Sequence, residues 1–215
     1  MKDKYTDLPP LFVKRYDFRP AVPMWQGQTA YILGGGSSFD PAQAEKLRGK
    51  NVIGCNEAFQ LGADVVPWCH FLDLAWWMEH KAAAKDYTGT FTTCATLVED
   101  PAVRVFKTRN KGIEFEQADT LGSNRNTGLS AINLAIHFGA TRIILIGFDM
   151  GGGEKGGHWY AREKPTNKSS LRMHRKSALE VYEDIEEHGG IEILNASPDS
   201  KLTYWPKITI EEALA

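Results

Sequence analysis

Short apolar runs alternate with helix-like segments along most of the chain from Thr29 onward. The runs predict buried strands within residues 29–36, 51–59, 65–73, 91–97, 103–109, 142–149 and 191–197. Capping residues, composition and helical spacing predict helices over 40–48, 74–85, 129–139 and 171–188. Strands that alternate with helices favour an α/β fold, a Rossmann-like and mostly parallel sheet with helices on both faces and a flexible lid.

Two segments fall outside this alternation. Residues 1–28 hold four of the ten prolines and no periodic pattern, so we expect an extended N-terminal arm. Residues 29–215 then form a single nucleotide-binding domain. Within it, residues 151–170 hold five glycines and no apolar periodicity, which predicts a lid. The polar stretch 110–125 predicts a loop.

Charge, cysteine content and hydropathy narrow the class of protein. The chain has 25 Lys and Arg against 27 Asp and Glu, a formal net charge of −2, so it lacks the global basic field that drives bulk nucleic-acid binding. Its three scattered cysteines form no CxxC, which argues against a zinc site and favours a reducing compartment. The longest dense apolar run, IILIGF, is too short to span a bilayer. We therefore expect a cytoplasmic protein, either a monomer or a homo-oligomer.

A glycine-rich turn follows the first predicted strand. Its residues are Gly34, Gly35, Gly36, Ser37 and Ser38, and either serine could cap the next helix. Such a turn brings backbone N–H groups up to a phosphate at a helix N-terminus. The spacing fits neither GxGxxG nor a Walker motif, so a plain tight turn is the alternative.

Polar residues also end later strands or begin a helix. Asn56 ends the second strand, where it could recognise a base or ribose or form an Asx turn. Asn126, Thr127 and Gly128 precede the helix over 129–139, where an ordinary cap is the alternative. Asp149 ends the strand over 142–149. Because ligands of doubly wound sheets bind outside the carboxyl ends of the strands, all of these groups are candidates.

A basic segment follows the predicted lid. Residues 162–176 contain six basic residues and one acidic residue, whereas residues 180–187 contain five acids and no base. This pattern suits either a solvated helix face or a group of cations that binds phosphate. His158, Tyr160 and His174 lie in the same region, and a histidine there could act as a general acid or base.

The motifs ILGGGSSF, VIGCNEAF and NTGLSAINLAIHFGATRIILIGFDM, in this order, resemble the bacterial sialyltransferases of glycosyltransferase family 42 and the related DUF115 group. The resemblance spans residues 29–150, with a weaker extension to Ser197-Pro198. Members of the DUF115 group include pterin pyrophosphokinases, and small proteins of this type occur in bacteriophages, which would place this chain in a host cytoplasm. The family pattern has an asparagine where this chain has Gly35.

The resemblance implies a nucleotide-sugar-dependent glycosyltransferase that needs no metal and no cofactor. Its donor would be a nucleotide-activated small molecule, with CMP-linked sugars among the candidates. The turn over 34–38 would hold phosphate, and Asn56 and Asn126 would hold the nucleoside. Asp149 would bind the ribose or the acceptor. His174, 24 residues before Pro198, matches the spacing of the family's catalytic histidine, and Tyr160 is a loose counterpart of tyrosines that assist the leaving phosphate.

Three other functions remain open. A pyrophosphokinase would use Mg²⁺ with ATP, and Asp73 and Asp149 would be its natural metal ligands. A non-catalytic nucleotide-binding module is favoured by the loss of the family's asparagine at Gly35. A dinucleotide oxidoreductase ranks last because the GxGxxG spacing is absent.

Overall fold

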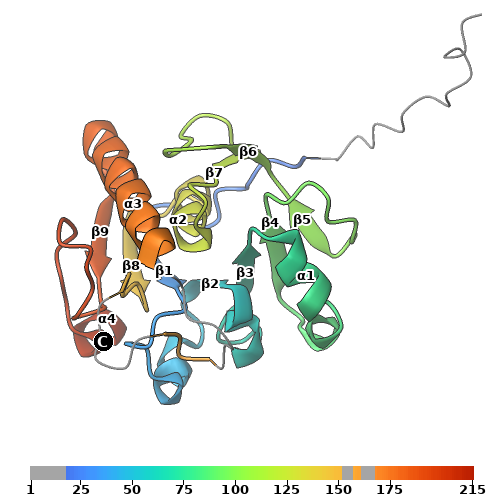
Figure 1. Ribbon diagram of the computed structural model, residues 1–215, viewed down its shortest axis with the longest axis horizontal. Helices are drawn as coiled ribbons and strands as arrows, with labels where there is room; N and C mark the ends of the chain where they lie inside the picture. The colour runs from blue at the N-terminus through green and yellow to red at the C-terminus, as the bar shows by residue number, and fades with distance from the viewer. Residues whose placement is uncertain (1–17, 152–156, 161–167) are drawn as a thin grey trace, which may run out of the picture.

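A sheet of seven parallel strands lies at the centre of the molecule (Figure 1). This computed structural model describes residues 18–151, 157–160 and 168–215. The strand order is β5-β4-β3-β2-β1-β8-β9. The bounds are β1 (Thr29–Leu33), β2 (Asn51–Cys55), β3 (Trp68–Phe71), β4 (Thr90–Thr93), β5 (Val103–Val105), β8 (Arg142–Ile146) and β9 (Glu192–Asn195). The predicted α/β fold with a parallel sheet is confirmed.

Each face of the sheet carries its own apolar core. Along β8, Ile143 and Leu145 belong to one core, whereas Ile144 and Ile146 belong to the other. Strands buried on both faces read as continuous apolar runs, which is why the sequence revealed them clearly. The first face is covered by α2 (Thr127–His137) and α3 (Lys168–His188). The second is covered by α1 (Leu74–His80), α4 (Ile210–Leu214) and the 3-10 helices η1 (Pro41–Leu47), η2 (Asn56–Leu61) and η3 (Ala83–Asp86).

The segment predicted as a loop over 110–125 is partly regular. It contributes β7 (Thr120–Gly122), which pairs in parallel with β6 (Lys107–Arg109) in a separate two-stranded sheet. The strand expected over 103–109 is therefore divided between two sheets. The Asn133 side chain on α2 accepts hydrogen bonds from the N–H groups of Glu114 and Gly122, at 2.8 and 2.9 Å. The buried Asn133 side chain thus supplies hydrogen-bond acceptors that a further strand beside β7 would otherwise supply.

The last part of the predicted N-terminal arm, residues 18–28, packs against the domain. Ala21 and Trp25 are buried, and the N–H of Trp25 donates to the carbonyl oxygen of Phe138 at 2.7 Å. The rings of Trp25 and Phe138 lie edge to face, 4.7 Å apart. This part of the arm belongs to the first core. Residues 1–17 lie outside the described residues.

The helix expected over 40–48 is a 3-10 helix, and its cap differs from the prediction. The N-cap is Asp40, whose carboxylate accepts from the N–H of Ala42 at 3.0 Å, with Pro41 at the first helical position. The expectation that Ser37 or Ser38 caps this helix is wrong, because both side chains are used elsewhere, as shown below.

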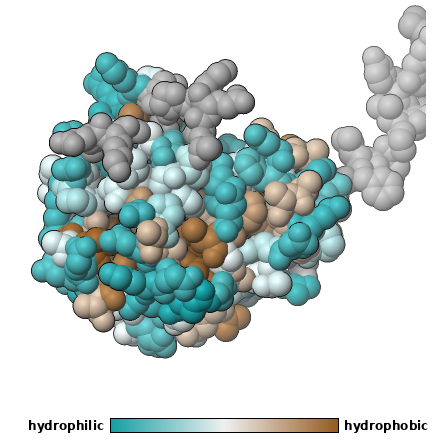
Figure 2. All heavy atoms as spheres, turned by 90° about the horizontal axis from the view of Figure 1, so that it is seen from below, coloured by the Kyte–Doolittle hydropathy of each residue, from teal (hydrophilic) through white to brown (hydrophobic). Residues whose placement is uncertain are grey.

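The surface is mainly polar on the face seen from below, and apolar atoms form small separate patches between the hydrophilic ones (Figure 2). Among the helices of the described ranges, none combines the length and the apolar character needed to cross a membrane.

Candidate functional site

The carboxyl ends of β1 and β8 lie side by side at the point where the strand order reverses. From β1 the chain adds β2 to β5 on one side, and then β8 and β9 on the other. Leu33 is paired with Ile146, so the turn over 34–38 faces residues 147–150. In open parallel sheets this switch point forms a crevice in which ligands bind.

The glycine turn packs directly on the end of β8. The N–H of Gly34 donates to the carbonyl oxygen of Ile146, and that of Gly36 donates to the carbonyl oxygen of Gly147, both at 2.8 Å. A Cβ atom added to Gly34 would lie 2.7 Å from the carbonyl oxygen of Gly147, and one added to Gly36 would lie 2.5 Å from the Cγ of Asp149. The close approach of two backbones therefore requires glycine at both positions.

Asp149 lies beneath this turn. The N–H of Ser38 donates to its Oδ2 at 2.9 Å, the Ser38 hydroxyl donates to its Oδ1, and the Ser37 Oγ lies 3.5 Å from its Oδ2. The residue is 5% exposed. The carboxylate at the end of β8 thus holds the two serines of the turn, which explains why neither serine caps η1.

The backbone around Asp149 is fixed by the C-terminal part of the chain. The N–H of Phe148 donates to the Ser197 hydroxyl at 2.8 Å, and the Ser200 hydroxyl donates to the carbonyl oxygen of Phe148 at 2.6 Å. On α3, Arg175 donates through Nη1 to the carbonyl oxygen of Met150 at 2.9 Å. Ser197, from the weaker part of the family resemblance, therefore fixes the backbone at the end of β8.

His158 and Tyr160 lie against the glycine turn. His158 forms an isolated antiparallel bridge with Gly36, and the N–H of Trp159 donates to the carbonyl oxygen of Gly35 at 3.0 Å. A Cβ atom on Gly35 would lie 2.7 Å from the His158 ring and 2.8 Å from the Tyr160 hydroxyl. Two candidate side chains thus reach the place where a phosphate is expected. Residues 152–156 and 161–167 of the predicted lid lie outside the described residues.

Asn56 and the start of α2 form the next part of the crevice. The Oδ1 of Asn56 lies 3.5 Å from the Thr127 hydroxyl. Asn126 caps α2, since its Oδ1 accepts from the N–H of Leu129 at 3.1 Å. A Cβ on Gly128 would lie 2.6 Å from the Phe148 ring, so this glycine lets α2 approach the end of β8. The end of β2, the start of α2 and the end of β8 are therefore neighbours in the structure.

Four non-glycine residues have a left-handed backbone. Asn56, Asn124, Arg125 and Met150 have φ between 49° and 54°. Asn56 and Met150 follow β2 and β8 of the central sheet, whereas Asn124 and Arg125 follow β7 of the two-stranded sheet and precede the cap of α2. Such conformations are uncommon outside glycine and gather at functional sites. The sequence motifs do not single out Asn124, Arg125 or Met150, although an asparagine just before a helix cap, as at Asn124, is typical of a turn.

His174 lies on α3, one turn before Ala178 on the helix face that carries the core residues Ala178, Val181 and Ile185. Burial lowers its pKa, so the neutral imidazole is favoured. Its Nδ1 is buried, and within the described residues it has no hydrogen-bond partner. Leu171 and Arg175, on either side of it, approach Gly151. His174 thus lies on the part of α3 that approaches Gly151, just after the end of β8.

The described ranges contain no group of three or more His, Cys, Asp or Glu side chains that could hold a metal ion. Asp73, one candidate magnesium ligand, is an exposed N-cap residue of α1, and Asp149, the other, is engaged by the turn. Cys55, at the end of β2, is buried, and burial raises the pKa of its thiol to about 12, so the thiol is protonated.

Two solved structures are similar to this chain, and both are of the sialyltransferase CstII from Campylobacter jejuni. One, in complex with the substrate analogue cytidine-5'-monophosphate, has 14% identity and a TM-score of 0.48, with 86% of each chain covered. The other, in complex with CMP-3FNeuAc, has 13% identity and a TM-score of 0.44, with 84% of this chain and 85% of that chain covered. No protein-family profile matches the chain. No curated protein matches it either.

Proposed function

We propose that this protein is a glycosyltransferase that uses a nucleotide-activated sugar, bound across the carboxyl ends of β1, β2 and β8. The observation that carries the proposal is that motifs far apart in the sequence lie next to one another at the switch point of the sheet. The glycine turn contacts the end of β8, Asn56 lies beside Thr127, and His158 and Tyr160 lie on Gly35. The resemblance of these motifs to glycosyltransferase family 42 supports sugar transfer as the chemistry.

The proposed roles follow from position. The backbone of residues 34–38 lies against the phosphate, and Asn56, Asn126 and Thr127 hold the nucleoside. Asp149 fixes the turn rather than touching the ligand, because Ser38 occupies both of its oxygens. Arg175, which reaches Met150, supplies positive charge near the phosphate.

Two histidines share the chemistry in this proposal. His158 and Tyr160 donate hydrogen bonds to the leaving phosphate and stabilise its charge. His174 takes the proton of the acceptor hydroxyl, for which its lowered pKa is suitable, since a base must be unprotonated. The activity in this proposal is sialyltransferase-like, and the donor is a CMP-linked sugar. The reaction needs no metal, as the family resemblance implies.

Ligand binding followed by hydrolysis of the donor tests the proposal. Thermal-shift titrations would compare CMP, UDP, GDP, ATP and NAD, with and without Mg²⁺. We expect stabilisation by CMP without Mg²⁺, and slow hydrolysis of a CMP-linked sugar, an assay that needs no acceptor. Stabilisation by ATP only with Mg²⁺ would instead favour a pyrophosphokinase. Nucleotide binding without hydrolysis would favour a binding module.

A further inference from the structure

A tryptophan fastens residues 157–160 to the glycine turn. Trp159 donates to two consecutive carbonyl oxygens, from its N–H to that of Gly35 at 3.0 Å and from its Nε1 to that of Gly34 at 2.9 Å. Because hydrogen bonds are directional, a main-chain bond and a side-chain bond to adjacent groups fix both the place and the orientation of the residue.

The indole ring is held on its apolar side as well. Trp159 is half-buried and packs against the second core. Its ring lies edge to face with that of Phe39, with centroids 5.6 Å apart and planes at 78°, a favoured geometry of aromatic pairs. Phe39 directly follows the glycine turn and is 2% exposed. The indole is therefore anchored to the turn at its nitrogen and to the core at its ring.

The residues on either side of Trp159 are the two that reach Gly35. A Cβ atom on Gly35 would lie 2.7 Å from the Cδ2 of His158 and 2.8 Å from the hydroxyl of Tyr160. The rings of His158 and Tyr160 are themselves neighbours, with centroids 5.0 Å apart. Since both residues are covalently joined to Trp159, a displacement of its backbone would move both side chains relative to the turn.

Trp159 has no donor left for a ligand. An indole carries one N–H and no acceptor, and the carbonyl oxygen of Gly34 occupies that N–H. The main-chain N–H of Trp159 is occupied by Gly35. Any effect of this residue on a bound phosphate must therefore pass through the groups that it holds in place.

We propose that Trp159 is a positioning residue that holds His158 and Tyr160 against Gly35, where they meet the leaving phosphate. The inference rests on the proposed function for the identity of the ligand. The anchoring itself is a property of the protein without ligand. Trp159 thus contributes to turnover without touching the reacting atoms, by keeping two hydrogen-bond donors in the geometry that the transition state needs.

Trp159→Phe tests the proposal, because phenylalanine keeps an aromatic ring beside Phe39 and removes only the indole donor. We expect hydrolysis of a CMP-linked sugar to slow by up to about 10²-fold, the usual effect of a small misplacement of a catalytic group. The same substitution in the double variant His158→Ala/Tyr160→Phe should slow the remaining hydrolysis by less than about twofold, since residues that act through one another are not additive.

Trp25→Phe is the matched control. Trp25 is also an indole packed edge to face on a phenylalanine, with centroids 4.7 Å from Phe138, the C-cap residue at the end of α2 away from the crevice. This variant should keep wild-type turnover, although it removes a buried ring system. An equal loss in Trp159→Phe and Trp25→Phe, or an equal effect of Trp159→Phe in both backgrounds, would overturn the positioning role.

Proton NMR supplies a readout that needs no ligand. In the wild-type protein we expect slow exchange of the Trp159 indole N–H and a nuclear Overhauser contact between the His158 ring and the Gly35 α-protons. This contact should weaken in Trp159→Phe and persist in Trp25→Phe. A contact of unchanged strength in Trp159→Phe, or an indole proton that exchanges as in an unfolded chain, would overturn the proposal. If no nucleotide bound, the proposed function would fail, and these contacts would still decide whether Trp159 holds its two neighbours in place.

Discussion

Gly35 defines part of the crevice by the side chain that it lacks. The His158 ring and the Tyr160 hydroxyl occupy the space where a Cβ would lie, at 2.7 and 2.8 Å. We expect Gly35→Ala to push both side chains off the turn and to weaken nucleotide binding by about 1–3 kcal/mol, since each lost polar contact leaves a group unpaired. Calorimetric titration of CMP measures the loss.

Gly49→Ala is the control for this substitution. Gly49 has open space around its Cβ position but a φ of +75°, so alanine there strains the backbone far from the crevice. It should lower stability by about 1 kcal/mol and leave affinity unchanged. Equal affinities for Gly35→Ala and the wild type would mean that His158 and Tyr160 do not meet the ligand on this turn.

Replacing His174 and replacing His158 should have different effects in a hydrolysis assay of the nucleotide sugar. His174→Ala should lower turnover of the nucleotide sugar by about 10²–10⁴-fold, the usual worth of general base catalysis, with little change in nucleotide affinity. His158→Ala should weaken binding as well, because His158 lies on the phosphate turn. Full turnover in His174→Ala with loss in His158→Ala would transfer the base to His158. Full turnover in both variants would show that neither histidine is needed for the reaction.

At the scale of elements, the sequence predicted the strands and helices that have a regular pattern of apolar residues. Every strand of the central sheet lies within or overlaps a predicted run. The central strands β1 and β8 are mostly apolar because both of their faces are buried, whereas β4, with the sequence TFTT, was marked mainly by its β-branched residues. The expected strand 51–59 ends at Cys55 because the left-handed Asn56 turns the chain into η2. No local pattern revealed β7, since its support comes from Asn133 on a helix that follows it in the chain. The hydrogen bonds between Asp149 and Ser38 likewise depend on β1 and β8 being neighbours in the sheet, which no local pattern encodes.

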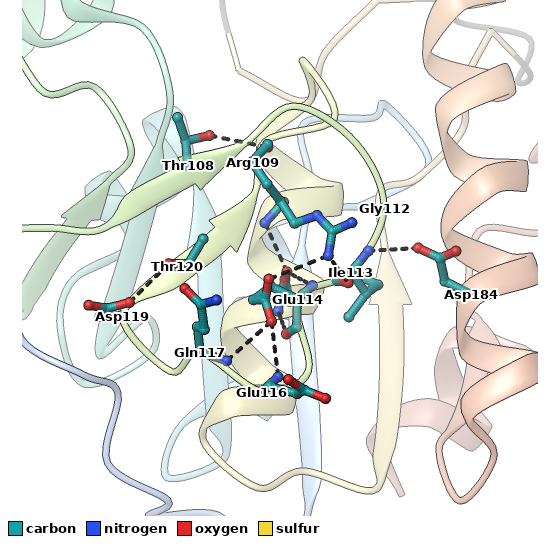
Figure 3. Close-up of polar contacts among 12 residues, drawn as sticks. Thr108, Arg109, Gly112, Ile113, Glu114, Glu116, Gln117, Asp119, Thr120 and Asp184 are labelled. Carbon is teal, nitrogen blue, oxygen red and sulfur yellow. Dashed lines mark hydrogen bonds and ion pairs between the residues drawn. The ribbon is translucent and has the colours of Figure 1, made fainter.

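The loop around Ile113 fastens α3 to the small sheet. Figure 3 shows Asp184, on α3, pointing at the backbone of this loop, and its Oδ2 accepts from the N–H of Ile113 at 2.8 Å. A Cβ on Gly112 would lie 2.3 Å from the same oxygen. We expect Asp184→Ala to lower the free energy of unfolding by about 1–3 kcal/mol, because it leaves a partly buried N–H unpaired. Urea unfolding measures the change.

Glu187→Ala is the comparison on the same helix. Glu187 is exposed in the last turn of α3, and its removal should change the free energy of unfolding by no more than about 0.5 kcal/mol. A similar loss in both variants would show that general helix charge, rather than the contact with Ile113, explains the effect of Asp184→Ala.

At the scale of the whole molecule, a buried histidine ties the sheet to one of its covering helices. His70, on β3, is 0% exposed. Its Nδ1 lies 2.9 Å from the Thr92 hydroxyl on β4, and its Nε2 lies 3.0 Å from the Ser130 hydroxyl on α2. Because two strands and a helix share this one ring, its protonation should affect global unfolding rather than a local movement.

The pH dependence of stability tests that expectation. Burial lowers the pKa of His70 from 6.5 to about 3, so the folded protein keeps the ring neutral while the unfolded chain takes up a proton below pH 6.5. The unfolded state then binds more protons, and the free energy of unfolding should fall by about 1.4 kcal/mol for each pH unit below 6.5 until the folded pKa is reached. Urea unfolding of wild type and His70→Met between those pH values isolates this slope, because all other titrating groups are shared. The variant should be less stable at neutral pH, where it leaves Thr92 and Ser130 without their partner, yet should lose less stability on acidification. Parallel curves for the two proteins would mean that His70 binds its proton equally in both states, and that the buried network does not exclude charge from the core.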